Sequence, residues 1–224
     1  MRYQFYREHK YVSAALNDVE RLIAKTDFTD VASVASVAQQ FDGLAQMLQA
    51  HAQYENAAIH ELLRKKNSTL HTQIESEHIL QDESLAEIQA LIAGIGDTVT
   101  EEEKIRRGYA LYLTYRKFVA DNLLHLHEEE TQILPELQRL YTDAELRQVA
   151  APAYREMMPE QIVQMLTGLF PHMNLADKKA FLVNIQALEP LKLSAVWAGI
   201  APLLSAQERD NLSRQIPVLD PAVS

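Results

Sequence analysis

The sequence contains no cysteine among its 224 residues. Disulfide bonds, a thiolate nucleophile and cysteine-ligated zinc or iron–sulfur clusters are therefore excluded, and histidine and carboxylate side chains must hold any metal. No run of about 18 apolar residues, the length that a membrane-spanning helix needs, is present either. The first ten residues lack a long apolar segment followed by small residues, so we expect no secretory leader and a cytoplasmic protein.

Positive charge is also scarce, because 21 lysines and arginines face 31 aspartates and glutamates and give a net charge of −10. A nucleic acid or an anionic membrane surface would need clustered lysine and arginine side chains. We therefore expect no nucleic acid and no membrane as a partner. The Gly-x-Ser-x-Gly motif of a serine nucleophile is absent as well, so the sequence offers no support for nucleophilic catalysis.

Glycine and proline are few, with six and eight residues, and apolar residues recur at spacings of three and four, which predicts helices. We predict four long helices at about residues 2–25, 31–64, 70–92 and 98–141. Residues 94–97 are expected to form the turn before the fourth helix, which Thr98 or Thr100 would open. Short connections favour antiparallel neighbours, so the predicted fold class is all-α, an up-down-up-down four-helix bundle over residues 1–142.

The sequence changes character after Thr142, where the predicted helices become shorter and prolines more frequent. We predict that residues 143–224 form a helical C-terminal extension that packs on the bundle. Its amphipathic segments, at residues 162–170, 181–188 and 193–204, offer apolar faces. We expect these C-terminal helices to be where a homodimer or another protein partner would bind.

Two His-x-x-x-Glu pairs carry the strongest chemical signal, namely His51 with Glu55 on the second helix and His125 with Glu129 on the fourth. At about 100° per residue, positions i and i+4 lie on one helix face, about 6 Å apart along the axis. Each pair can therefore present an imidazole and a carboxylate to one cavity. A single pair of this kind is also an ordinary surface ion pair worth a few tenths of a kcal/mol, so the interpretation depends on there being two.

His9 on the first helix and His78 on the third complete a set in which every helix of the bundle supplies one histidine. By the same rotation, His60 and His127 lie about 180° and 200° from the candidate histidine of their own helix and should face away. Four histidines and two bridging carboxylates would give each of two metal ions about two nitrogen and two oxygen donors. An oxo or hydroxo bridge would add a fifth ligand and leave one position open.

Other designs fit the spacing less well. A ferritin-like di-iron bundle needs Glu-x-x-His on two helices, and only residues 75–78 show it. The His-Glu-x-x-His arrangement of catalytic zinc is absent. A bundle without metal stays open, although four buried imidazoles and two carboxylates would carry a heavy desolvation cost. Iron, manganese and zinc all suit imidazole and carboxylate, so the identity of the metal also stays open.

Residues 1–142 resemble the hemerythrin-like, or HHE cation-binding, domain family. The motifs that carry the resemblance are Arg7-Glu8-His9, His51-x-x-x-Glu55, Glu77-His78 and, most specifically, His125-x-x-x-Glu129-Glu130-Thr-Gln-Ile-Leu-Pro135. The resemblance implies two iron ions, oxo- or hydroxo-bridged, with both glutamates bridging. The metal ligands that it implies are His9, His51, Glu55, His78, His125 and Glu129.

The resemblance also implies a class of function. Oxygen-carrying hemerythrins have His-x-x-x-His on the third helix, whereas here His78 is followed four residues later by Asp82. The four-His, two-Glu set is more similar to bacterial di-iron proteins that repair iron–sulfur clusters, although their cysteine-containing N-terminal domain is missing. We expect a protein that binds or reacts with O₂, peroxide or NO, in stress response, iron handling or iron-centre repair. The alternative is an iron- or oxygen-sensing module in which metal occupancy controls folding and partner binding.

Overall fold

The computed structural model describes residues 2–219, and every regular element in this part of the chain is helical. The chain divides into two compact units. The first, residues 12–140, is called the bundle unit below. The second, called the C-terminal unit, joins the N-terminal segment up to Tyr11 with the chain from Tyr141 onward. The division into a bundle domain ending at residue 142 and an extension that packs on it stays a prediction.

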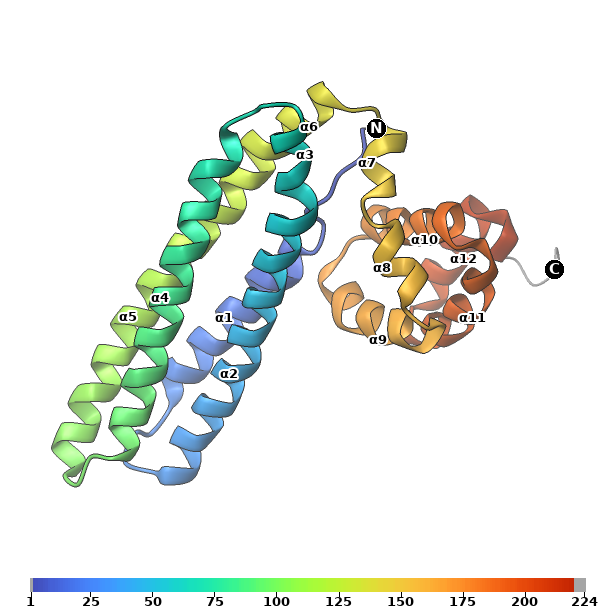
Figure 1. Ribbon diagram of the computed structural model, residues 1–224. Coiled ribbons are helices and arrows are strands. Elements are labelled where there is room, and N and C mark those ends of the chain that lie inside the picture. The colour runs from blue at the N-terminus through green and yellow to red at the C-terminus, as the bar shows by residue number, and fades with distance from the viewer. Residues whose placement is uncertain (1, 220–224) are drawn as a thin grey trace. The chain divides into compact units, whose positions relative to one another are not determined.

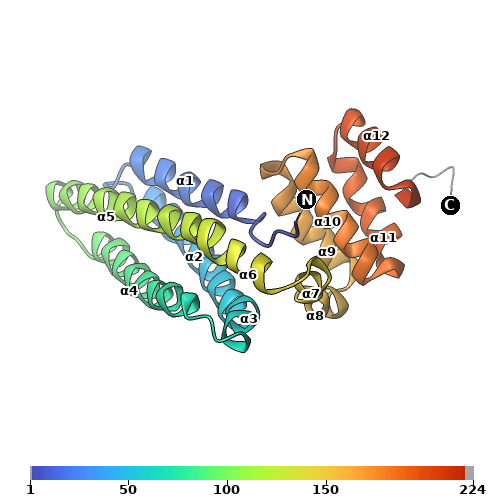
Figure 2. The same cartoon turned by 90° about the horizontal axis from the view of Figure 1, so that it is seen from above.

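Four long helices lie side by side in the bundle, as Figures 1 and 2 show. Two of them continue through a π-helical turn into a short helix. The elements are α1 (His9–Lys25), α2 (Val31–Tyr54) with η1 (Glu55–Ile59) and α3 (His60–Lys65), α4 (Leu70–Gly96), and α5 (Glu101–Glu128) with η2 (Glu129–Ile133) and α6 (Leu134–Leu140). The predicted all-α, up-down-up-down bundle is therefore confirmed.

The helices bury the apolar stripes that their sequences predict. Helix α1 contributes Val12, Leu16, Val19 and Ile23, spaced by three and four, to a core completed by apolar residues of α2, α4 and α5. Tyr115 in the middle of α5 is fully buried, and its hydroxyl donates a hydrogen bond of 2.9 Å to the Leu16 carbonyl. That bond satisfies a polar group that burial would otherwise leave without a partner.

The first helix begins at His9, so the prediction of a helix from Arg2 was wrong. Residues 2–8 are held in another conformation by side chains that are distant in sequence. Within the C-terminal unit, Arg2 pairs with Asp143 at 2.7 Å and Arg7 pairs with Asp177 at 2.8 Å. Phe5 and Tyr6 are buried. These tertiary contacts outweigh the helical propensity of the segment.

The third long helix extends to Gly96, four residues beyond the predicted end at Ile92. Ile95 is buried in the core, so apolar burial favours another turn despite the two glycines. The Gly94 carbonyl near this helix end accepts hydrogen bonds from Arg107 Nη1 at 2.9 Å and Thr98 Oγ1 at 2.7 Å. Thr100, one of the two predicted caps, opens α5 by accepting from the Glu103 amide.

Two glycines of the bundle provide a matched test of this packing. A Cβ at Gly43, on an exposed face of α2, would meet no atom within 4 Å, whereas a Cβ at Gly108 of α5 would overlap the Phe28 ring. We expect Gly43→Ala to raise the free energy of unfolding by ~0.5–1 kcal/mol, because alanine favours the helix. Gly108→Ala should lower it by ~1–3 kcal/mol through overpacking. Urea denaturation checks both, and equal effects would contradict the packing described.

The C-terminal unit has a core of its own, separate from that of the bundle. Thr142 forms a capping box with Glu145 at its start. Lys192 Nζ donates to the carbonyls of Tyr154 and Met157 at 2.6 and 2.8 Å, which joins two of its helices. Its elements are α7 (Asp143–Gln148), α8 (Ala151–Glu156), α9 (Pro159–Leu169), η3 (Phe170–His172), α10 (Leu175–Leu188), α11 (Pro190–Ile200), η4 (Ala201–Leu203), α12 (Ala206–Gln215) and η5 (Pro217–Leu219).

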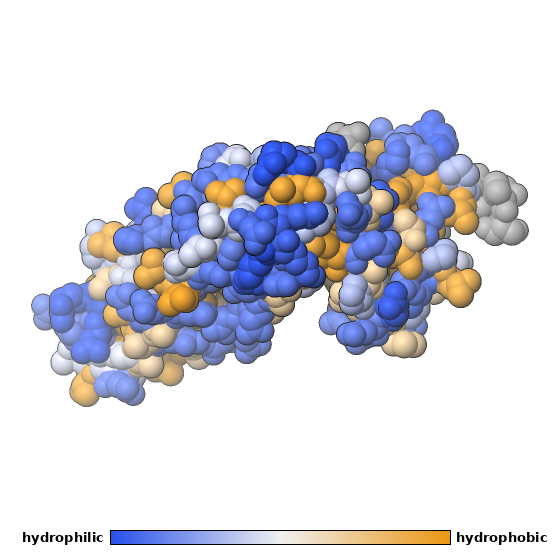
Figure 3. All heavy atoms as spheres, turned by 45° about the horizontal axis from the view of Figure 1, so that its top comes forward, coloured by the Kyte–Doolittle hydropathy of each residue, from blue (hydrophilic) through white to orange (hydrophobic). Residues whose placement is uncertain are grey.

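The surface is consistent with apolar burial inside each unit. On the face seen in Figure 3, hydrophilic residues predominate and hydrophobic ones form small patches between them. Among residues 2–219, none of the helices has the length and apolar character needed to span a membrane.

Candidate metal centre

Both carboxylates of the two His-x-x-x-Glu pairs open a π-helical turn, Glu55 in η1 and Glu129 in η2. A π turn contains one residue more than an α turn and is often found at functional sites. Both side chains are almost completely buried, with exposed fractions of 1 % and 0 %. Burying a carboxylate costs several kcal/mol unless opposite charge offsets it. The two buried glutamates therefore favour a cation beside them.

One group of donors lies entirely within the bundle unit. It consists of Glu55 from η1, His78 from α4, and His125 and Glu129 from α5 and η2. One donor atom from each lies within 4.8 Å of the others, and all four side chains are buried. Metal–donor bonds of about 2.1 Å place opposite donors about 4.2 Å apart, so a small closure would bring this group to bonding distance.

The nitrogens in this group are arranged as a cation requires. The Nε2 atoms of His78 and His125 face each other at 3.1 Å. His78 Nε2 lies 3.4 Å from Glu55 Oε2, and His125 Nε2 lies 3.6 Å from Glu129 Oε2. Burial lowers the pKa of His125, so its imidazole is neutral near pH 7, which metal binding needs. Converging lone pairs and carboxylates repel one another unless a cation lies among them, so these residues fit a metal ion.

A second group shares both carboxylates with the first. It consists of His9, His51, Glu55 and Glu129, again with one donor atom from each within 4.8 Å of the others. His51 Nε2 lies 3.1 Å from Glu55 Oε1, as the i,i+4 spacing predicts. His9 stands on the first turn of α1, and the following turns of that helix form part of the bundle core. Two overlapping groups therefore join two different pairs of histidines to one shared pair of carboxylates.

Two further side chains orient the histidines of the first group. Glu77 accepts a hydrogen bond from His125 Nδ1 at 2.8 Å, and Asn56 Oδ1 accepts one from His78 Nδ1 at 3.1 Å. Each bond leaves the Nε2 atom as the one that can bind a metal. No pattern in the sequence predicts these roles. The only local signal is that Asn56 directly follows Glu55 and that Glu77 directly precedes His78.

His60 does not face away from the cavity, so that prediction was wrong. It is fully buried, its ring stacks on that of His78 with centroids 5.7 Å apart, and its Nδ1 donates to Asn56 Oδ1 at 3.0 Å. The extra residue of η1 shifts the helix phase by roughly 100°, which turns His60 toward the other histidines. Burial lowers its pKa to about 4, so this imidazole stays neutral. His127 is exposed, as predicted.

The hydrogen bond from His125 to Glu77 allows a direct test. We expect Glu77→Ala to weaken cation binding by about 10–100-fold, because such orienting partners typically contribute that much. Competition with a coloured chelator measures the affinity. Glu83→Ala, an exposed change on the same helix, is the control and should bind as the unchanged protein does. Equal affinities for the two variants would show that Glu77 has no orienting role.

Fold and donor groups together define a helical bundle of the cation-binding class. The model of the hemerythrin HHE cation-binding domain matches residues 1–137. This match covers more than half of the chain, which therefore belongs to the hemerythrin HHE cation-binding domain family. Searches of curated proteins and of solved structures found no match.

Proposed function

We propose that this chain is a non-haem di-iron protein whose centre binds or reacts with O₂, peroxide or NO, in stress response or iron handling. The observation that supports it best is the sharing of Glu55 and Glu129 between two donor groups. A single-ion site would need only one of these groups. We assign His9, His51, His78 and His125 as terminal ligands and the two glutamates as bridging ligands.

The donor set favours iron within this proposal. Each ion would have two imidazoles and a share of two carboxylates, a set that suits iron or manganese at six-coordinate positions better than a closed tetrahedral zinc. When bound, an iron pair supplies redox-active positions that take up small oxygen- or nitrogen-containing ligands. Manganese and zinc remain alternatives that elemental analysis distinguishes.

The chain's own residues would prepare the centre for such ligands. Glu77 and Asn56 fix two imidazoles through their Nδ1 atoms, so little rearrangement is needed on binding. Ile59, Ile133 and Leu63, which are almost completely buried near the two carboxylate turns, help to exclude bulk water. His51 is the least buried of the six proposed ligands, so its side of the centre is where a small molecule would have the easiest access.

The test is spectroscopic. Iron-loaded protein should show near-ultraviolet and visible charge-transfer absorption. The spectrum should change when O₂ is added to the reduced form, and it should also change on addition of NO or of peroxide. The Glu55→Ala variant, treated identically, is the control and should show neither. An iron-loaded protein whose spectrum responds to none of the three ligands would refute the proposed reactivity while leaving metal binding intact.

Sensing is the second candidate, supported by the distribution of the proposed ligands over four helices of the chain. Because metal-binding free energy is also folding free energy, metal occupancy would control folding and, with it, the binding of a homodimer or another protein partner in the cytoplasm. If so, iron should change protease sensitivity within α9–α12. Unchanged cleavage there, with a clear spectral response to NO or O₂, would favour the first candidate.

A further inference from the structure

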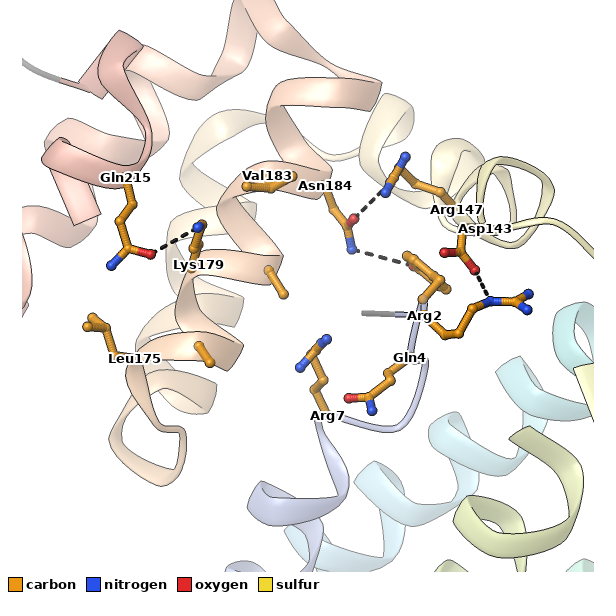
Figure 4. A pocket seen from close by; sticks show the side chains of 13 residues that line it. Arg2, Gln4, Arg7, Asp143, Arg147, Leu175, Lys179, Val183, Asn184 and Gln215 are labelled. Carbon is orange, nitrogen blue, oxygen red and sulfur yellow. Dashed lines mark hydrogen bonds and ion pairs between the residues drawn. The ribbon is translucent and has the colours of Figure 1, made fainter. Parts of the chain in front are cut away.

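The C-terminal unit contains a cavity of about 650 Å³ that is separate from the proposed metal ligands. Figure 4 shows its wall, which combines one face of α10 with Arg147 of α7, Gln215 of α12 and the segment of residues 2–7. All of these residues belong to the same compact unit. Pockets that bind small molecules typically have volumes of about 300–1,000 Å³, so this one has room for a ligand.

One face of α10 gives the cavity an apolar wall. Ala176, Ala180 and Val183 are spaced by four and three residues, so they lie on the same side of the helix, and Leu175 adds to them at its start. Lys179 stands on this face as well. The helix therefore presents aliphatic surface with a cation beside it.

The charge of the lining is positive, although the whole chain carries −10. Four cationic side chains line the cavity, and Asp143 is its single acidic residue. Arg2 pairs with Asp143, and Arg7 pairs with Asp177. The remaining two, Arg147 and Lys179, form no ion pair with any carboxylate within residues 2–219.

Neutral groups hold these two cations in place. Arg147 Nε donates to Asn184 Oδ1 at 3.2 Å, and Lys179 Nζ donates to Gln215 Oε1 at 2.9 Å. Asn184 in turn donates to the Tyr3 hydroxyl at 3.4 Å. Burial raises the pKa of Tyr3 to about 12, so its phenol adds no negative charge. Two oriented cations without carboxylate partners are therefore available to an anion that enters the cavity.

We propose that this cavity binds a small organic anion, whose carboxylate, sulfonate or phosphate group meets Arg147 and Lys179 while its apolar body lies on α10. The ligand needs both a negative charge and an apolar body. An inorganic ion would leave the apolar wall exposed to water, and a neutral ligand would leave the two cations without an anionic partner. The inference does not depend on the metal centre, since none of the lining residues is a proposed metal ligand.

The probe for the test is 8-anilinonaphthalene-1-sulfonate, which joins an apolar body to a sulfonate and fluoresces when bound. Titrated into the full-length metal-free chain, it should bind saturably, and Arg147→Gln combined with Lys179→Gln should weaken binding by about tenfold or more. Ala176→Glu, an exposed change that adds a negative charge to the wall, should weaken it as well. The control, Arg155→Gln with Arg214→Gln, removes the same charge from exposed positions in the same unit and should bind unchanged.

Competition separates the two parts of the proposed ligand. Phenyl phosphate and octanoate should displace the probe, whereas inorganic phosphate and benzyl alcohol, which each lack one part, should displace it much more weakly. Melting curves establish that each variant is folded. The proposal is overturned if folded variants at Arg147 and Lys179 bind the probe like the control, or if benzyl alcohol competes as well as phenyl phosphate.

Discussion

Replacing Glu55 or Glu129 by alanine is expected to reduce bound metal from about two ions per chain to well below one. Each carboxylate belongs to both donor groups, so losing either removes a ligand from both positions at once. His78 belongs to one group only, so His78→Ala should remove about one ion and leave the other. Elemental analysis of protein purified from iron-supplemented cells measures this difference.

The control for these variants is Glu130→Ala. Glu130 directly follows Glu129 in the same π-helical turn but is exposed and lies in neither donor group. It should retain the full metal content. If Glu55→Ala and Glu129→Ala kept about two ions, neither carboxylate would be a bridging ligand. If His78→Ala and Glu55→Ala lost the same number of metal ions, then His78 would not serve one ion only, and the model of two ions with shared carboxylates would be wrong.

Removing the metal is expected to lower the melting temperature of the bundle unit by on the order of 10 °C. Binding about 1,000-fold above the dissociation constant contributes about 4 kcal/mol, and each kcal/mol shifts the melting of a unit of this size by several degrees. Without a cation, the buried carboxylates and converging imidazoles lose the charge that offsets their desolvation. Calorimetry with and without a chelator measures the shift.

Hydrogen exchange locates the same effect in the structure. Chelation should speed amide exchange in η1, η2 and the neighbouring turns of α4, which carry the proposed ligands. The double variant Glu55→Ala, Glu129→Ala should already exchange at the metal-free rate and should not respond to chelator. A wild-type protein whose melting and exchange ignore the chelator would show that cation binding is not coupled to the stability of the bundle.

The helical class and the antiparallel bundle could be predicted because local spacing and short connections determine them. Helix boundaries that depend on distant residues could not. Arg2 and Arg7 have their carboxylate partners more than 140 residues away, and no local pattern in residues 2–8 indicates that pairing. The extension of α4 to Gly96 likewise depends on tertiary contacts, namely the burial of Ile95 and the hydrogen bond that Arg107 of the next helix donates to the Gly94 carbonyl.

The candidate centre was predictable to a different degree for each residue. The His-x-x-x-Glu spacing places His51 beside Glu55 on geometry alone, and the structure has them 3.1 Å apart. The π-helical turns that begin at Glu55 and Glu129 have no sequence rule of that kind, and they change the helix phase beyond them. His60 was therefore assigned to the wrong face. The role of Glu77 depends on His125, which lies 48 residues away.

Two donor groups that share Glu55 and Glu129 should hold two metal ions. The metal-free, full-length chain can be titrated anaerobically with ferrous iron, freed of unbound ions and submitted to elemental analysis. We expect saturation at about two ions per chain, with near-ultraviolet charge-transfer absorption appearing after exposure to air. Saturation at one ion, or no retained iron at all, would show that the two carboxylates do not hold an ion pair.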